Sequence, residues 1–131
     1  MTTLDTRTII TPVYEALSGL RNQYNKNNTR LKEQKNQAVE LYTYLATWGM
    51  MRLKAEEKAL SQDGKKDVVK KYFQCLAQIT SKPNLAQDSG LDTLKTLSSD
   101  EYLGLTGLGL AIAQEFGFWA TAIYADITGD D

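Results

Sequence analysis

The most apolar stretch of the chain is residues 98–125, SSDEYLGLTGLGLAIAQEFGFWATAIYA. Its large apolar side chains recur at steps of three and four residues, which is helical spacing: Leu105, Leu108, Ile112, Phe116, Trp119 and Ile123. Ser98 and Glu101 have the spacing of a capping box, which predicts where the helix begins. Because a helix that is apolar on all sides must be buried, we expect the other helices to cover this one on most of its sides.

Three glycines and one carboxylate in this stretch leave alternatives open. Gly104, Gly107 and Gly109 each cost about 1 kcal/mol relative to alanine inside a helix. They indicate either close packing against a neighbouring backbone or a break near residues 107–109. The stretch is also long enough to span a membrane, which takes about 20 residues. Glu115 would then lie near the bilayer centre at a cost of about 2.5–3.5 kcal/mol, so we expect a buried helix and no membrane contact.

The rest of the chain has helical periodicity and no strand-like alternation of useful length. These patterns predict an all-α fold. The length of 131 residues fits a single helical domain over residues 1–131. We expect a bundle of about five helices, with a long second helix and the apolar C-terminal helix described above.

The helix boundaries follow from local signals. Thr11 and Pro12 have the form of an N-cap followed by a first helical residue, with residues 1–10 as a frayed lead-in. The long second helix is expected over residues 29–61, with Gly49 as the place for a kink. Two further helices are expected at residues 65–80, capped by Asp63, and at residues 91–97. The stripe of the second helix that should face a partner consists of Leu31, Ala38, Leu41, Tyr42, Leu45 and Trp48.

Few of the side chains that carry enzyme chemistry are present. The chain has no histidine, the commonest general base and metal ligand. Its single cysteine, Cys75, lies among Tyr72, Phe73 and Leu76, which predicts a buried, inert thiol. One cysteine cannot form an internal disulfide and fits a reducing cytoplasm. We therefore expect a cytoplasmic protein that is not an enzyme, with no metal and no cofactor.

The net charge of −1 conceals a segregation of charge along the chain. Residues 21–71 contain 12 basic and 6 acidic residues, a net charge of +6, and the rest of the chain carries −7. Such asymmetry is typical of a region that faces a polyanion, although ordinary solvated helix faces would give the same count. The candidate nucleic-acid-binding residues are the basic side chains of this region: Arg21, Lys26, Arg30, Lys32, Lys35, Arg52, Lys54, Lys58, Lys65, Lys66, Lys70 and Lys71.

Several local motifs carry a family resemblance. They are LYTYLATWGMM at residues 41–51, KYFQCL at residues 71–76, and the order of residues 94–97, 99–102 and 111–123, the last rich in Phe, Trp and Ala. In these motifs the chain resembles the small all-helical subunit of type III CRISPR RNA-guided effector complexes, in particular the Cmr-type version.

The resemblance implies a non-catalytic subunit that stacks with copies of itself and with other effector subunits. Its basic helix faces would contact the backbone of the guide RNA and the target RNA. A second interpretation belongs to a different class, a helical protein–protein adaptor whose charged faces serve only solubility. The first interpretation requires the basic side chains to gather on one outward surface.

Overall fold

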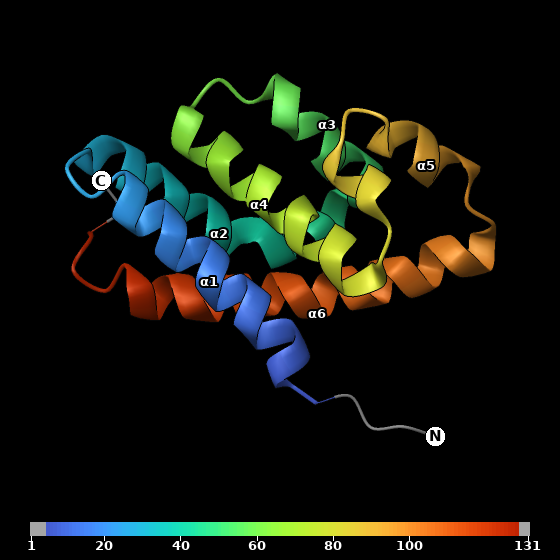
Figure 1. Ribbon diagram of the computed structural model, residues 1–131. Coiled ribbons are helices and arrows are strands. Elements are labelled where there is room, and N and C mark those ends of the chain that lie inside the picture. Colours follow the sequence, from blue (N-terminus) through green and yellow to red (C-terminus); the bar gives the residue numbers. More distant parts are fainter. Residues whose placement is uncertain (1–4, 129–131) are drawn as a thin grey trace.

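The computed structural model describes residues 5–128. Within them the chain forms six α-helices and one short 3₁₀ helix, with no strand. The prediction of an all-α bundle is therefore confirmed, with six helices instead of about five. In chain order they are α1 (Arg7–Gln23), α2 (Asn28–Trp48), α3 (Met50–Ala59), α4 (Asp63–Thr80), η1 (Pro83–Ala86), α5 (Gly90–Thr96) and α6 (Ser99–Ile123), as shown in Figure 1.

Helix α6 is continuous and begins as the sequence predicts. The Ser98 side chain accepts a hydrogen bond from the backbone N–H of Glu101, and the Glu101 carboxylate accepts one from the N–H of Ser98. The break expected as an alternative near residues 107–109 does not occur. Helix α6 packs against α1, α2 and α4, and within residues 5–128 no helix has both the length and the apolar character of a membrane span.

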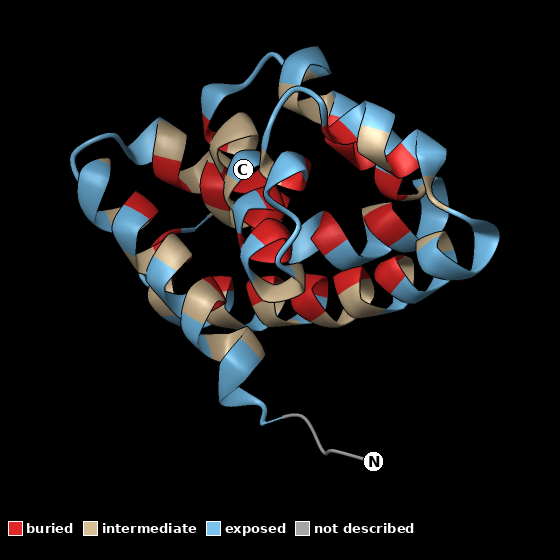
Figure 2. Ribbon diagram, turned by 45° about the vertical axis from the view of Figure 1, so that its right-hand side comes forward, coloured by how far each residue is buried: buried red, intermediate tan, exposed pale blue. Residues whose placement is uncertain are grey.

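The expectation that α6 is covered on most sides is wrong. Leu103 is 72% exposed and Phe118 is 64% exposed. A Cβ added to Gly104 or Gly107 would meet no atom within 4 Å, so this side of the helix faces solvent. Exposed and buried residues alternate along α6 with the helical period, as Figure 2 shows. The two glycines on the open face add little to the apolar area in contact with water, to which Leu103 and Phe118 contribute most.

Helix α1 begins one turn earlier than predicted. It starts at Arg7, and Pro12 lies inside the helix, where its ring lacks the N–H of an ordinary residue. The Asp5 carboxylate accepts a hydrogen bond from the backbone N–H of Arg7 and pairs with its guanidinium, which satisfies one N–H at the helix start. Ile9 lies four residues before the buried Val13 and packs against the core. The added turn therefore buries apolar surface, which offsets the proline.

Gly49 separates α2 from α3, so the single long helix expected over residues 29–61 is two helices. The glycine has φ 90° and ψ 168°, a backbone conformation that side chains disfavour. The sequence pointed to this residue as a kink, and the structure makes it a full break. The chain turns there so that Met50 and Leu53 are buried and α3 can pack against α4 and α5.

Helix α4 begins at Asp63, but Asp63 does not cap it as predicted. The N-cap is Gln62, whose side chain makes no capping hydrogen bond. The N–H of Gly64 donates instead to the Glu33 carboxylate of α2, at 2.9 Å. A Cβ on Gly64 would lie 2.4 Å from the carbonyl oxygen of Arg30, so this glycine allows α4 to approach the backbone of α2.

The core lies where α2, α4 and α6 meet. Tyr72 of α4 is fully buried, and its hydroxyl donates a hydrogen bond to the carbonyl oxygen of Gly109 in α6, at 2.8 Å. The ring of Tyr72 packs against Phe73 and Phe116. Cys75 is also buried, and burial raises the pKa of its thiol to about 12, so it remains protonated at neutral pH.

Candidate nucleic-acid interface

Two of the predicted RNA-binding cations hold the segment that follows α6. The Arg21 guanidinium donates two hydrogen bonds to the Asp126 carboxylate, both 2.7 Å, and one to the carbonyl oxygen of Ile123. These bonds lower the pKa of Asp126 to about 2. The Lys35 ammonium donates to the carbonyl oxygen of Ile127 at 2.6 Å. Both cations therefore contribute to the fold, whatever else they contact.

Arg30 belongs to a polar network inside the bundle. Its guanidinium donates to both carboxylate oxygens of Asp67, at 2.7 and 2.8 Å, and lies over the ring of Tyr24. The Gln34 amide donates to the same carboxylate at 3.0 Å and accepts a hydrogen bond from the hydroxyl of Tyr124 at 2.7 Å. The network links α2, α4 and the residue after α6. Arg30 is thus neutralised and largely occupied.

Replacing Asp67 with alanine should lower the free energy of unfolding by about 2–3 kcal/mol, because it leaves a half-buried guanidinium and a buried amide without their acceptor. Urea denaturation measures the loss. Asp63 supplies a matched control, since it is an exposed carboxylate 4.0 Å from the same guanidinium. Asp63→Ala should change stability by less than about 1 kcal/mol. Equal losses in the two variants would contradict the network.

Lys54 cannot serve as an RNA contact, which corrects the prediction for this residue. It is 4% exposed, and its ammonium pairs with Glu57 at 2.7 Å and lies 4.9 Å from the centre of the Phe73 ring. The residue falls on the inner face of α3, beside Leu53. A count of basic residues along the sequence does not distinguish this buried lysine from exposed ones.

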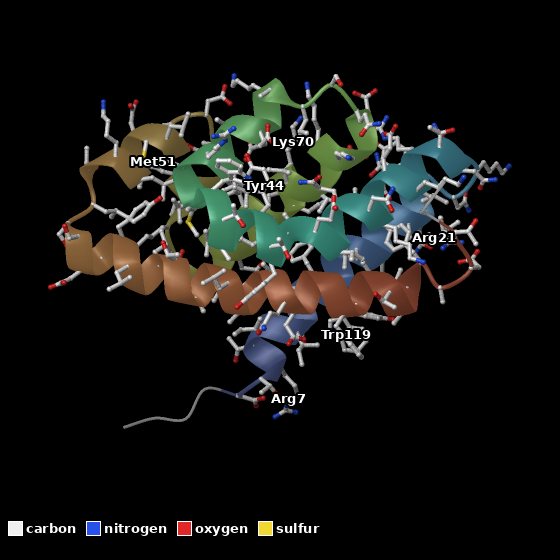
Figure 3. The ribbon with its side chains drawn as sticks, turned by 180° about the vertical axis from the view of Figure 1, so that it is seen from behind. Arg7, Arg21, Tyr44, Met51, Lys70 and Trp119 are labelled. Atoms are coloured by element: carbon white, nitrogen blue, oxygen red, sulfur yellow. The ribbon has the colours of Figure 1, made fainter. Side chains whose placement is uncertain are left out.

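The other cations do not gather on one surface. Lys58 lies 3.5 Å from Asp88, and Lys32 is half-buried on α2. Among the remaining predicted lysines, no ion pair with the residues at positions 5–128 is formed by Lys26, Lys65, Lys66, Lys70 or Lys71. Figure 3 shows Arg21 at one end of the bundle and Lys70 along the α4 side. The single basic surface expected from the sequence is therefore absent from the described part of the chain.

One smaller surface does combine positive charge with a concave shape. It lies on the outer face of α2 and consists of two adjoining concavities of about 590 and 420 Å³, which we call the α2 groove. The first is lined by Lys35, Asn36, Lys65 and residues 125, 127 and 128, and the second by Thr43, Tyr44, Thr47 and Trp48. Val39 and Glu40 line both concavities, so the two adjoin along α2.

Charge is arranged unevenly along the α2 groove. Lys35 and Lys65 line one end, which is therefore the positive end. The carboxylate of Glu40 lies in the middle. At the other end the Arg52 guanidinium lies over the Trp48 ring, 4.2 Å from its centroid. From Lys35 to Trp48 the groove follows α2 for about 20 Å, at 1.5 Å per residue.

Trp48 belongs to this surface, although the helical spacing of the sequence predicted that it would face a partner helix. The predicted stripe of α2 places it and Tyr42 against a partner helix, but both are exposed, and Trp48 is 53% exposed. The helix ends at Trp48, and the turn at Gly49 carries the chain away before a neighbour can cover the indole. The hydroxyl of Tyr44, which lines the same groove, has a raised pKa because it is partly desolvated, so it stays neutral.

Comparison of the chain with protein-family models, with curated proteins and with solved structures gave no match. No group of three or more His, Cys, Asp or Glu side chains with metal-binding geometry occurs within residues 5–128. The α2 groove contains two lysines, several hydroxyls and one indole. These side chains can bind phosphate, ribose and a planar ring.

Proposed function

We propose that this protein is a non-catalytic small subunit of a cytoplasmic RNA-guided effector complex, the role that its resemblance to the type III CRISPR small subunits implies. In this proposal the α2 groove contacts the backbone of the guide RNA or target RNA, while other surfaces contact neighbouring subunits, including copies of this chain. The observation that supports it is that Lys35 and Lys65 both line the same end of an open groove. The Lys35 ammonium has three N–H groups, and one of them donates to the carbonyl oxygen of Ile127.

The charge of the groove sets the expected affinity. Each phosphate neutralised on a single strand contributes a slope of about 0.7 to the dependence of log K on log salt. Two lysines at the positive end therefore predict a slope near 1.4, which is small for a protein that binds RNA alone. The acidic remainder of the chain gives a net charge of −1 and does not add attraction. The protein would accordingly hold RNA together with adjacent subunits.

Charge reversal at Lys65 tests the groove. Lys65→Glu should weaken binding of single-stranded RNA at low salt by about tenfold or more and reduce the salt slope by about 0.7, because it removes one phosphate contact. Fluorescence anisotropy over a salt series measures both quantities. Lys66→Glu is the matched control, since it makes the same charge change at the next residue of α4, which does not line the groove. It should retain most of the affinity.

A second variant tests the same surface in the opposite direction. Glu40→Gln should strengthen RNA binding several-fold, because it removes the one carboxylate that lines both concavities.

If Lys65→Glu and Lys66→Glu weaken binding equally, the attraction is diffuse and the groove is not the site. Absence of RNA binding at low salt, with neighbouring subunits present, would overturn the proposed function.

One observation favours the adaptor as a second candidate. A further concavity of about 690 Å³ lies between α3, α5 and α6. Its lining is mainly apolar and includes Met51, Leu94, Leu97, Tyr102 and Leu103, beside Lys95, two serines and Thr106. It adjoins the open face of α6 through Leu103. An exposed apolar surface of this kind is common at protein–protein contacts. The adaptor accounts for this surface without RNA, and the salt series described above separates the two candidates.

A further inference from the structure

One end of the α2 groove carries a large aromatic ring that the core does not use. Among the described residues, Trp48 belongs neither to the buried core nor to the partly buried side chains packed against it. More than half of the side chain is exposed. Its only ring contact within residues 5–128 is the cation–π contact with Arg52. The guanidinium covers part of the indole, and Trp48 also lines the groove, so the exposed part of the ring is accessible there to a planar ligand.

We propose that Trp48 stacks on an unpaired base of single-stranded RNA whose phosphates lie at the Lys35–Lys65 end of the same groove. This inference rests on the proposed function and adds to it the form of the RNA and the residue that receives a base. Stacking on an aromatic side chain is tolerant of sequence, because every base has a π-face. The site would therefore recognise a single strand without reading its sequence.

The distribution of charge in the groove supports this orientation. Lys35 and Lys65 attract phosphate at one end, whereas Glu40 repels it in the middle. A base is uncharged, so it can lie over the centre of the groove, where the Glu40 carboxylate disfavours a phosphate, and reach Trp48 beyond it. The hydroxyls of Thr43 and Thr47 line that half of the groove and can bond to a ribose 2′-hydroxyl or to a base edge.

The geometry selects an unpaired strand over a duplex. In a duplex the faces of the bases are stacked on one another, and a protein reaches only their edges and the backbone. An indole that receives a base on its face requires a nucleotide that has left the stack. Trp and Arg are also enriched in protein–protein interfaces, but the two lysines in the same groove favour a polyanionic ligand.

Tryptophan fluorescence tests the proposal directly. The full chain carrying Trp119→Phe reports on Trp48 alone, because the protein has two tryptophans. We expect quenching by a single-stranded RNA of about 12 nucleotides, within the range that single-strand sites cover. We expect little quenching by a blunt duplex of the same sequence or by an abasic strand of the same length, which keeps the phosphates and lacks the bases.

The matching variant is Trp48→Leu, which should weaken single-strand binding by about 10- to 100-fold at every salt concentration and leave the salt slope unchanged. Tyr14→Leu is the control, because Tyr14 is an exposed aromatic of α1 that does not line the groove. It should bind as the parent does. The fluorescence experiment keeps Trp48, so its result does not depend on the stability of the Trp48→Leu variant.

The outcomes separate this inference from the proposed function. Salt-dependent RNA binding without quenching, and with an unchanged affinity for Trp48→Leu, would overturn the stacking role and leave the RNA-contacting role standing. Equal quenching by the abasic strand would also overturn it. Absence of binding by any strand at low salt would overturn the proposed function itself. In that case Trp48 and Arg52 would be part of a protein-binding surface.

Discussion

Replacing Phe116 with alanine should lower the free energy of unfolding by about 3–5 kcal/mol, the largest stability effect we expect from one side chain in α6. Phe116 is fully buried in the middle of the helix, and its ring lies 5.7 Å from that of Tyr72. The substitution removes its apolar contacts, leaves a cavity and ends an aromatic pair worth about 0.5–1.5 kcal/mol. Urea denaturation followed by circular dichroism measures the change as a lower midpoint.

Phe118 provides the matched control for this experiment. It is the same residue type in the same helix, two positions later, but it is mostly exposed and contacts only Trp119 among the aromatic rings at positions 5–128. Phe118→Ala should cost less than about 1 kcal/mol. Similar losses for the two phenylalanines would show that both faces of α6 are buried, for example by association of the protein with itself, and would contradict the description of an open face.

Replacing Gly109 with alanine should destabilise the protein by about 1–3 kcal/mol, because the core has no space for one more methyl group. A Cβ at this position would lie 2.5 Å from Cε of Met50 and 2.6 Å from the hydroxyl oxygen of Tyr72. The methionine end is flexible and can move. The tyrosine hydroxyl cannot move freely, because it donates to the Gly109 carbonyl.

At Gly107, two residues before Gly109, we expect an alanine substitution to have the opposite effect on stability. Its added Cβ would meet no atom within 4 Å, so Gly107→Ala should stabilise the protein by about 0.4–1 kcal/mol through the reduced conformational freedom of the unfolded chain. Thermal unfolding of the two variants measures the difference in sign. If both alanine variants gained stability, Gly109 would not lie at the contact between α4 and α6.

The sequence predicts best what depends on neighbours in the chain. The capping box at Ser98 and the helical periodicity of residues 98–125 involve residues within a few positions of each other, and both are confirmed. The roles of individual glycines are different. Gly107 and Gly109 stand in the same local sequence, and only distant residues such as Met50 and Tyr72 make one of them a close contact. No local pattern contains that information.

The start of α1 and the break at Gly49 show a second limit. A proline at position 12 resembles a first helical residue, but burial of Ile9 extends the helix past it. The sequence on both sides of Gly49 favours a helix, which predicts one continuous helix. Whether a glycine bends or ends a helix depends on what α3 can pack against after the turn, which is a tertiary property.

The candidate site was the least predictable feature. The charge count identifies residues 21–71 as basic, and the α2 groove does use Lys35 and Lys65 from that region. It cannot show that Arg30 is paired with Asp67, 37 positions away, or that Lys54 is buried. Helical spacing also assigned Trp48 to the core, because periodicity alone does not show where the covering helices end.

The hydrogen bonds from Arg21 and Lys35 to the segment after α6 have a consequence for biosynthesis. They join positions that are 102 and 92 residues apart, and the bond between Tyr124 and Gln34 joins positions 90 apart. Because a ribosome makes the chain from its amino end, α1 and α2 emerge long before these partners exist. Assembly of that end of the bundle must wait until residues 123–127 have been synthesised. In a nascent chain that pauses earlier, the Gln34 side chain would lack its hydrogen bond from Tyr124.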